Sequence, residues 1–216
     1  MRTDLACLDR IPRLSAEIAV KILNMLVLSV CIALATASCR GGQEQSANVS
    51  TTPDVVRAAQ EVVAAMQAKD GERLAGLAHP QKGVRFSPYA YVDREHDRVF
   101  SGQQIKKFWT DRQTYNWGDE DGTGDPIMLT PAQYYERFIM DRDFANPSSI
   151  SVNADRASGN TQNNAAVGYP DGTRVELYLA PASGNPEFDW AALRLVFEQV
   201  AGTWYLVGVI HDQWTT

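Results

Sequence analysis

The sequence predicts an α+β domain in which N-terminal helices pack on one face of a curved antiparallel sheet. Three observations support that class. Apolar residues recur at helical spacing in the first part of the domain, the period changes in the middle, and long β-type segments close the chain. Two helices, mixed segments and a terminal meander of strands are typical of an α+β architecture.

The first predicted element is an amphipathic helix capped by Thr52. A proline follows Thr52 directly, and proline at the first helical position loses no hydrogen bond and has its φ preset. Apolar side chains then recur on one face, and Gly71 is expected to end the helix. A shorter helix is predicted over residues 72–78, where a histidine and a proline stop it.

The middle of the chain mixes short elements. Residues 84–92 are β-prone but contain a proline, which predicts an edge or bulged strand. Capping-box signatures at Ser101 and Thr130 predict two further helices. Residues 117–125 are predicted to form a loop rich in glycine and acidic residues, and residues 146–164 to be irregular or partly extended.

The C-terminal third carries the clearest strand pattern. Residues 174–179 alternate between apolar and polar side chains. Residues 193–200 and 203–210 flank Ala201 and Gly202, a pattern that predicts a tight hairpin. Both hairpin strands have apolar residues on both faces, so we expect the hairpin to lie at the centre of the sheet with both of its faces covered by other parts of the domain.

An apolar run over residues 25–37 leads to Cys39. It is too short for a comfortable membrane-spanning helix, which needs about 20 apolar residues, so a cleaved signal fits better. The small residues Ala37 and Ser38 before Cys39, with a positive charge ahead of the run, resemble a bacterial lipoprotein signal. That resemblance implies that Cys39 becomes an acylated N-terminus and anchors the protein in the membrane. The alternative is a secretory signal cleaved at an Ala-x-Ala-like site, with Cys39 incidental.

These features divide the chain into three parts. We expect a signal peptide over residues 1–38, a lipidated flexible tether over 39–52 and a single α+β domain over 53–216. Residues 1–19 mix acids and bases, so we hypothesise that they are untranslated and that Val20 is the start. The expected localisation is the bacterial cell envelope, lipid-anchored on the periplasmic or surface side.

Cysteine use and charge exclude several function classes. The only cysteines are Cys7, Cys31 and Cys39, so the domain has no catalytic thiol, cysteine-ligated zinc or disulfide. The formal net charge is −6 and the domain contains no run of lysine or arginine, so we expect no nucleic-acid partner. The domain also lacks a phosphate-cradling loop and a Gly-x-Ser-x-Gly elbow, and we expect no cofactor.

The domain contains three short motifs that point to one superfamily. They are Lys69-Asp70-Gly71 after the first helix, His79-Pro80 after the second, and Trp204 to Val207 in the terminal hairpin. Together they resemble the nuclear transport factor two-like (NTF2-like, cystatin-like) superfamily of cone-shaped α+β domains. Residues 79–93, 117–130 and 206–215 also resemble blocks of a bacterial lipoprotein family of unassigned function. The superfamily resemblance implies a conical pocket on the concave face of the sheet and, by analogy, a homodimer. It does not choose between isomerases, dehydratases and ligand binders.

Four residues are candidates for acid–base catalysis. His211 and Asp212 stand at the end of the last strand and either could serve as a base, with Tyr89 or Tyr91 as the proton donor. Adjacent strand residues point to opposite faces, so His211 and Asp212 share a pocket only if the strand has ended. The alternative roles are a hydrogen-bonded histidine at a strand end and an aspartate that caps a turn.

Four residues are candidates for ligand binding. Arg85, Tyr89 and Tyr91 are separated by even numbers of residues along a predicted strand, so their side chains are expected on the same face. That arrangement would place a cation and two phenols beside one ligand. Trp117, beside the acidic loop, is a candidate platform for a flat ligand. The alternative for the tryptophans is burial in the core.

Three acidic residues form a weak calcium candidate. Asp119, Asp121 and Asp125 lie in a glycine-containing loop, and hard cations prefer several flexible oxygen ligands. The spacing does not complete an EF-hand, because Thr130 stands at the closing position. The alternative is a solvated turn, and we expect no resident metal.

The expected function is that of a lipid-anchored extracytoplasmic domain that binds a small molecule or an envelope partner without catalysis. One alternative is an isomerase or dehydratase that uses the conical pocket. Another is a protein-interaction module that uses a sheet edge near Pro88. A desolvated carboxylate facing a phenol in a pocket favours the enzyme, and a pocket filled by aromatic side chains favours a structural module.

Overall fold

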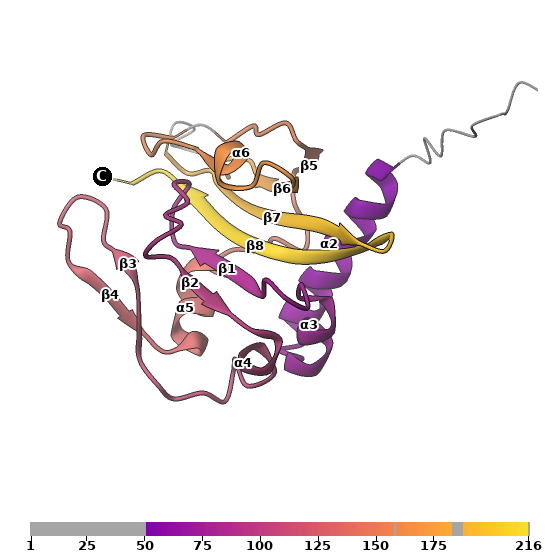
Figure 1. Ribbon diagram of the computed structural model, residues 1–216. Helices are drawn as coiled ribbons and strands as arrows, with labels where there is room; N and C mark the ends of the chain where they lie inside the picture. Colours follow the sequence, from indigo (N-terminus) through magenta and orange to yellow (C-terminus); the bar gives the residue numbers. More distant parts are fainter. Residues whose placement is uncertain (1–50, 158, 183–187, 216) are drawn as a thin grey trace, which may run out of the picture. The chain divides into compact units, whose positions relative to one another are not determined.

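The computed structural model describes residues 51–157, 159–182 and 188–215 (Figure 1). The predictions for the signal peptide, for Cys39 and for nearly all of the tether therefore lie outside the described residues. Among the described helices, none combines the length and the apolar content that crossing a bilayer requires.

A six-stranded sheet forms the centre of the described domain, with strand order β2-β1-β8-β7-β6-β5. It curves without closing into a barrel (Figure 1). All neighbouring strands run antiparallel except β1 and β8, which are parallel. A separate hairpin pairs β3 with β4. The strands are β1 (Val84–Ser87), β2 (Arg98–Phe100), β3 (Tyr115–Asp119), β4 (Pro126–Leu129), β5 (Ser149–Val152), β6 (Thr173–Leu179), β7 (Ala191–Val200) and β8 (Thr203–Gln213).

Four helices share one core with the inner face of the sheet, and a single short helix contributes to a cluster on the outer face. The inner helices are α2 (Thr51–Gln67), α3 (Gly71–Leu77), α4 (Gly102–Lys106) and α5 (Pro131–Phe138), and the outer one is α6 (Ala165–Gly168). The predicted α+β class, with a curved sheet and N-terminal helices on one face, is confirmed.

Local signals at helix ends and at the terminal hairpin are also confirmed. The capping boxes predicted at Ser101 and Thr130 both form, each with a glutamine three residues later. Ala201 and Gly202 adopt φ values of 50° and 82°, and they join β7 to β8 as predicted. β7 and β8 occupy the centre of the sheet.

The boundary between the first two helices differs from the prediction. α2 ends at Gln67, and the positive φ of 51° falls on Lys69 instead of Gly71. Gly71 begins α3, whose N-cap is Asp70. A Cβ atom on Gly71 would lie 2.4 Å from the carbonyl oxygen of Lys106, so the glycine allows α3 and α4 to approach closely.

The prediction of an edge or bulged strand over residues 84–92 is wrong in its extent and its position in the sheet. β1 ends at Ser87 and lies inside the sheet, between β2 and β8. Pro88 follows directly and the chain leaves the sheet there, because proline cannot donate to a ladder. The sheet edges are β2 and β5. The predicted loop over residues 117–125 is likewise shorter, since β3 and β4 flank its two ends.

Aromatic side chains fill the space between the inner helices and the sheet. Trp117 stacks on Tyr134 with ring centroids 3.9 Å apart, and Phe86 meets Trp117 and Phe100 edge to face. All four side chains are buried. They occupy the place where the superfamily resemblance implies a conical pocket.

Candidate binding site

His211 and Asp212 lie on opposite faces of β8. His211 points to the inner face, where it is buried against the ring of Phe138. Its Nε2 lies 3.3 Å from Oδ1 of Asp141, and its Nδ1 lies 3.3 Å from the carbonyl oxygen of Pro88. None of the pockets described below includes His211 in its lining.

Asp212 points to the outer face and belongs to a buried ion cluster. Arg194, which is 0% exposed, donates from Nη2 to Oδ2 of Asp212 at 2.7 Å and from Nε to Oε2 of Glu176 at 3.0 Å. Burial raises the pKa of both carboxyl groups, and the guanidinium of Arg194 opposes that rise. His211 and Asp212 therefore form no shared acid–base site.

The remaining candidates are divided between the core, two pockets and an exposed turn. Trp117 is a core residue that donates from Nε1 to the carbonyl oxygen of Leu129 at 2.8 Å, so it offers no ligand platform. Arg85 lines a separate pocket with Lys82 and Arg94, because β1 ends before Pro88 and the predicted parity does not continue. The expected grouping of Arg85 with the two tyrosines is wrong.

Tyr89, Tyr91, Asp119 and Asp121 do meet, in a surface pocket of about 360 Å³ that we call the tyrosine pocket. The phenol of Tyr89 donates to Oε2 of Glu120 at 3.2 Å and accepts from the backbone N–H of Asp121 at 3.2 Å. Burial, ahead of other causes, raises the pKa of Tyr89. Asp125 is exposed and does not line this pocket.

The calcium hypothesis finds no support in this geometry. Within the described ranges, no group of three or more histidine, cysteine, aspartate or glutamate side chains is placed to hold a metal ion. Glu120 is already engaged by Arg137 through two bonds of 2.7 Å, which hold the pKa of Glu120 below its usual range.

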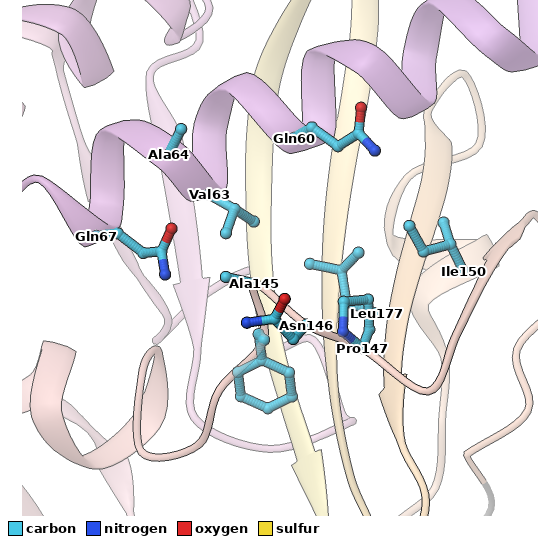
Figure 2. Close-up of a pocket in the computed structure, with 10 residues that line it drawn as sticks. Gln60, Val63, Ala64, Gln67, Ala145, Asn146, Pro147, Ile150 and Leu177 are labelled. Carbon is cyan, nitrogen blue, oxygen red and sulfur yellow. The ribbon is translucent and has the colours of Figure 1, made fainter.

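A second cavity, which we call the α2 cleft, opens between α2 and the strand edge at β5 and β6 (Figure 2). Its volume is about 430 Å³, within the range of small-molecule sites. Figure 2 shows Gln60, Val63 and Gln67 on the side of α2 that faces the strands. The lining residues are Gln60, Val63, Ala64, Gln67, Phe144, Ala145, Asn146, Pro147, Ile150 and Leu177.

The α2 cleft has apolar walls and amide groups, and none of its ten lining residues carries an ionisable side chain. Val63 and Leu177 are buried within the lining, while Gln60 and Gln67 are exposed. Neither glutamine side chain hydrogen-bonds to a described residue. Such a site can hold an uncharged ligand by apolar contact and amide hydrogen bonds, and it offers no side chain for proton transfer or nucleophilic attack.

Sequence reasoning did not identify these cleft residues. Gln60, Val63 and Gln67 stand at positions i, i+3 and i+7, so one face of α2 mixes amides with the apolar stripe. That mixed face is a local signal that could have been found. Phe144 and Asn146 come from a segment without a regular pattern, and only the fold brings them to α2.

Comparisons with known proteins give limited information. No protein-family model matches the sequence, and no curated protein matches it. One similar solved structure is an NTF2-like designed protein with 13% identity and a TM-score of 0.33, covering 76% of this chain and 98% of its own. Another is a candidate calcium/calmodulin-dependent protein kinase II association domain from Xanthomonas campestris, with 15% identity and a TM-score of 0.28, covering 69% of this chain and 78% of its own. Likenesses this distant carry no argument about the site.

Proposed function

We propose that this chain is a lipid-anchored domain of the bacterial cell envelope that binds an uncharged small molecule in the α2 cleft without catalysis. The observation that carries the proposal is the lining of the cleft, which combines apolar walls with amide groups and has no ionisable side chain. An uncharged ligand avoids the desolvation cost that a charged ligand would meet there without a partner.

The isomerase or dehydratase alternative has less support. Acid–base chemistry needs a titratable side chain within hydrogen-bond reach of the substrate. His211 is buried against Phe138, and Asp212 is held by Arg194 on the other face of the sheet. Tyr89 already donates to Glu120, outside the α2 cleft.

The membrane half of the proposal rests on the sequence. The apolar run before Cys39 supports export, and acylation of Cys39 would supply a membrane anchor. A homodimer through the outer face of the sheet is not favoured, because Ala157, Ala165 and Tyr169 pack against that face. Any homodimer would therefore use another surface.

Blocking the α2 cleft tests the binding function. Ala64→Trp places a bulky side chain in the cleft, whereas Ala68→Trp places the same side chain one turn further on, outside it. Native mass spectrometry of the full chain, purified from its own envelope, is expected to show a retained neutral adduct in the wild type and in Ala68→Trp. The adduct should be absent from Ala64→Trp.

Two outcomes contradict the proposal. A wild-type chain without any adduct argues against a resident ligand, and an adduct that survives Ala64→Trp places the ligand elsewhere. Circular dichroism of each variant checks that the fold is retained.

A further inference from the structure

The pocket that contains Arg85 lies on the outer face of the sheet, and we call it the arginine pocket. Its volume is about 380 Å³. The chain as a whole has a formal net charge of −6, yet three cations and two acids line this pocket and leave a surplus of one positive charge. The charged lining residues are Lys82, Arg85, Arg94, Asp171 and Glu198.

The two arginines of the pocket are not neutralised by the domain itself. Lys82 pairs with Glu198, but Arg85, Arg94 and Asp171 form no ion pair with any described residue. Arg85 is half-buried, and its Nη1 donates to two backbone carbonyl oxygens of the segment after β1 at 3.2 and 3.3 Å. These two contacts hold the guanidinium group in place without balancing its charge.

The hydroxyl group of Tyr169 gives a second observation that is independent of the charges. This side chain lines the pocket and is only 8% exposed, yet its hydroxyl group forms no hydrogen bond with a described residue. A buried donor without an acceptor is unfavourable unless a ligand supplies one. The hydroxyl group therefore indicates a ligand that accepts a hydrogen bond, as an anion does.

The fold holds this hydroxyl group close to Arg85. A Cβ atom on Gly208 would lie 2.4 Å from Oη of Tyr169, so only a glycine leaves room for the hydroxyl group at this point of β8. Gly208 is paired with Arg85 on the neighbouring strand β1. Burial raises the pKa of Tyr169, and the positive charges of Arg85 and Arg94 oppose that rise. The phenol and both guanidinium groups therefore act on one small region.

We propose that the arginine pocket is a second binding site, which takes a small organic carboxylate with a short alkyl group. Arg85 and Arg94 bind the carboxylate, and the hydroxyl group of Tyr169 donates to it. Val99 and Val207, which also line the pocket, contact the alkyl part. A carboxylate carries the single negative charge that matches the surplus of the pocket, whereas a phosphate dianion would leave one charge unbalanced. This site is separate from the α2 cleft and does not depend on the function proposed for it.

The test uses sodium butyrate as the probe and the ¹⁵N-labelled full chain in detergent micelles at pH 7. Amide shifts are followed by NMR during titration, with sodium chloride at equal ionic strength and butanamide as the uncharged analogue. We expect saturable shifts around residues 82–85, 94–99 and 168–171 with butyrate, and none of this kind with butanamide.

Variants locate the interaction. Arg94→Gln is expected to weaken butyrate binding about 5-fold, because it removes an exposed cation of the pocket. Tyr169→Phe removes only the hydroxyl group and should weaken binding about 5- to 10-fold. Arg112→Gln is the matched control, because Arg112 is an exposed arginine that does not line the pocket, and its affinity should stay within about 2-fold of the wild type.

The stability of Tyr169→Phe gives a second readout that needs no probe. If the hydroxyl group has no acceptor in the free protein, its removal should leave the midpoint of urea unfolding unchanged or raise it. A lower midpoint would show that the hydroxyl group is already hydrogen-bonded, for example by a buried water molecule, and would contradict its assignment to a ligand.

Three binding results also overturn the proposal. Shifts that sodium chloride reproduces indicate general screening, and equal losses in Arg94→Gln and Arg112→Gln indicate a diffuse charge effect. Inorganic phosphate that saturates the same amides more tightly than butyrate, with no loss in Tyr169→Phe, rules out a carboxylate site built around the phenol.

Discussion

At the scale of single residues, buried charges are the main source of pH sensitivity in this domain. Asp97 on the pocket side and the cluster around Arg194 on the outer face each remove carboxyl groups from water. The carboxylate of Asp97 forms no ion pair with a described residue, and the nearby Arg85 donates to its backbone carbonyl, whereas Glu176 and Asp212 share one guanidinium. The two sites therefore respond differently to pH and to substitution.

Asp97 should make the folded state less stable as the pH rises. Burial raises its pKa from 3.8 to about 7, against the opposing effects of Ser87, the backbone N–H of Asp93 and the charge of Arg85. The folded state therefore holds this proton more tightly than the unfolded state does. That contribution is complete below about pH 4 and is lost as the pH rises through about 7.

Urea unfolding of the wild type and of Asp97→Asn between pH 5 and 8 tests this prediction. Over that range the free energy of unfolding of the wild type should fall by about 2 to 3 kcal/mol more than that of the variant, since the other carboxyl groups with raised pKa values are common to both proteins. Parallel profiles for the two proteins would show that Asp97 does not titrate in this range.

Removing Arg194 should be strongly destabilising. Arg194→Met leaves Glu176 and Asp212 buried without their cation, and breaking a buried pair in this way costs about 3 to 5 kcal/mol. Urea unfolding at pH 7 measures the loss. Adding Glu176→Gln and Asp212→Asn should recover part of it, and a triple variant as unstable as Arg194→Met would assign the loss to packing instead.

At the scale of elements, the short helices depend on their ends and contacts more than on their length. α3 has seven residues and two glycines, and it is ordered by the Asp70 cap and by close approach to α4. Its two glycines are in different situations. Gly71 faces the backbone of Lys106, while a Cβ atom on Gly76 would meet nothing within 4 Å.

The two glycines of α3 should therefore respond to alanine with opposite signs. Gly71→Ala is expected to lower the free energy of unfolding by about 1 to 3 kcal/mol, because the new Cβ clashes with backbone atoms. Gly76→Ala should raise it by about 0.5 to 1 kcal/mol through helix propensity. Thermal and urea unfolding of both variants check this, and a loss of stability in Gly76→Ala would contradict the open space seen there.

At the scale of the whole molecule, the described domain has pockets beside a filled core. The α2 cleft lies beside the edge strand β5, and the tyrosine pocket lies where the chain leaves β1 and where β3 ends. The core on the inner face of the sheet is filled by stacked aromatic side chains. The α2 cleft and the tyrosine pocket therefore both lie where loops and helix faces meet the sheet.

Membrane attachment is a further prediction at this scale. Cys39→Ser should abolish acylation and leave the precursor unprocessed, because one sulfur carries the proposed lipid and directs the proposed cleavage. Mass spectrometry of the N-terminus from the producing cells measures both effects. An N-terminus processed as in the wild type would contradict a lipid anchor at Cys39.

Local chemistry was sufficient to predict several parts of this protein from its sequence. Capping boxes at Ser101 and Thr130, the Ala201-Gly202 turn and the central β7–β8 hairpin all depend on residues close together in the chain. The α+β class follows from the same local patterns. The opposite directions of His211 and Asp212 follow from the alternation of a strand.

Only the tertiary structure decided where the pockets lie. β1 is interior because it pairs with β8, more than 100 residues later, and no local pattern reports such a pairing. The same holds for the approach of Phe144 to α2 and for the filling of the core by Trp117. The sequence by itself determined the class and the turns, because these depend on neighbours. A pocket depends on which side chains from distant parts of the sequence come together, and only the packing of the whole core determines that.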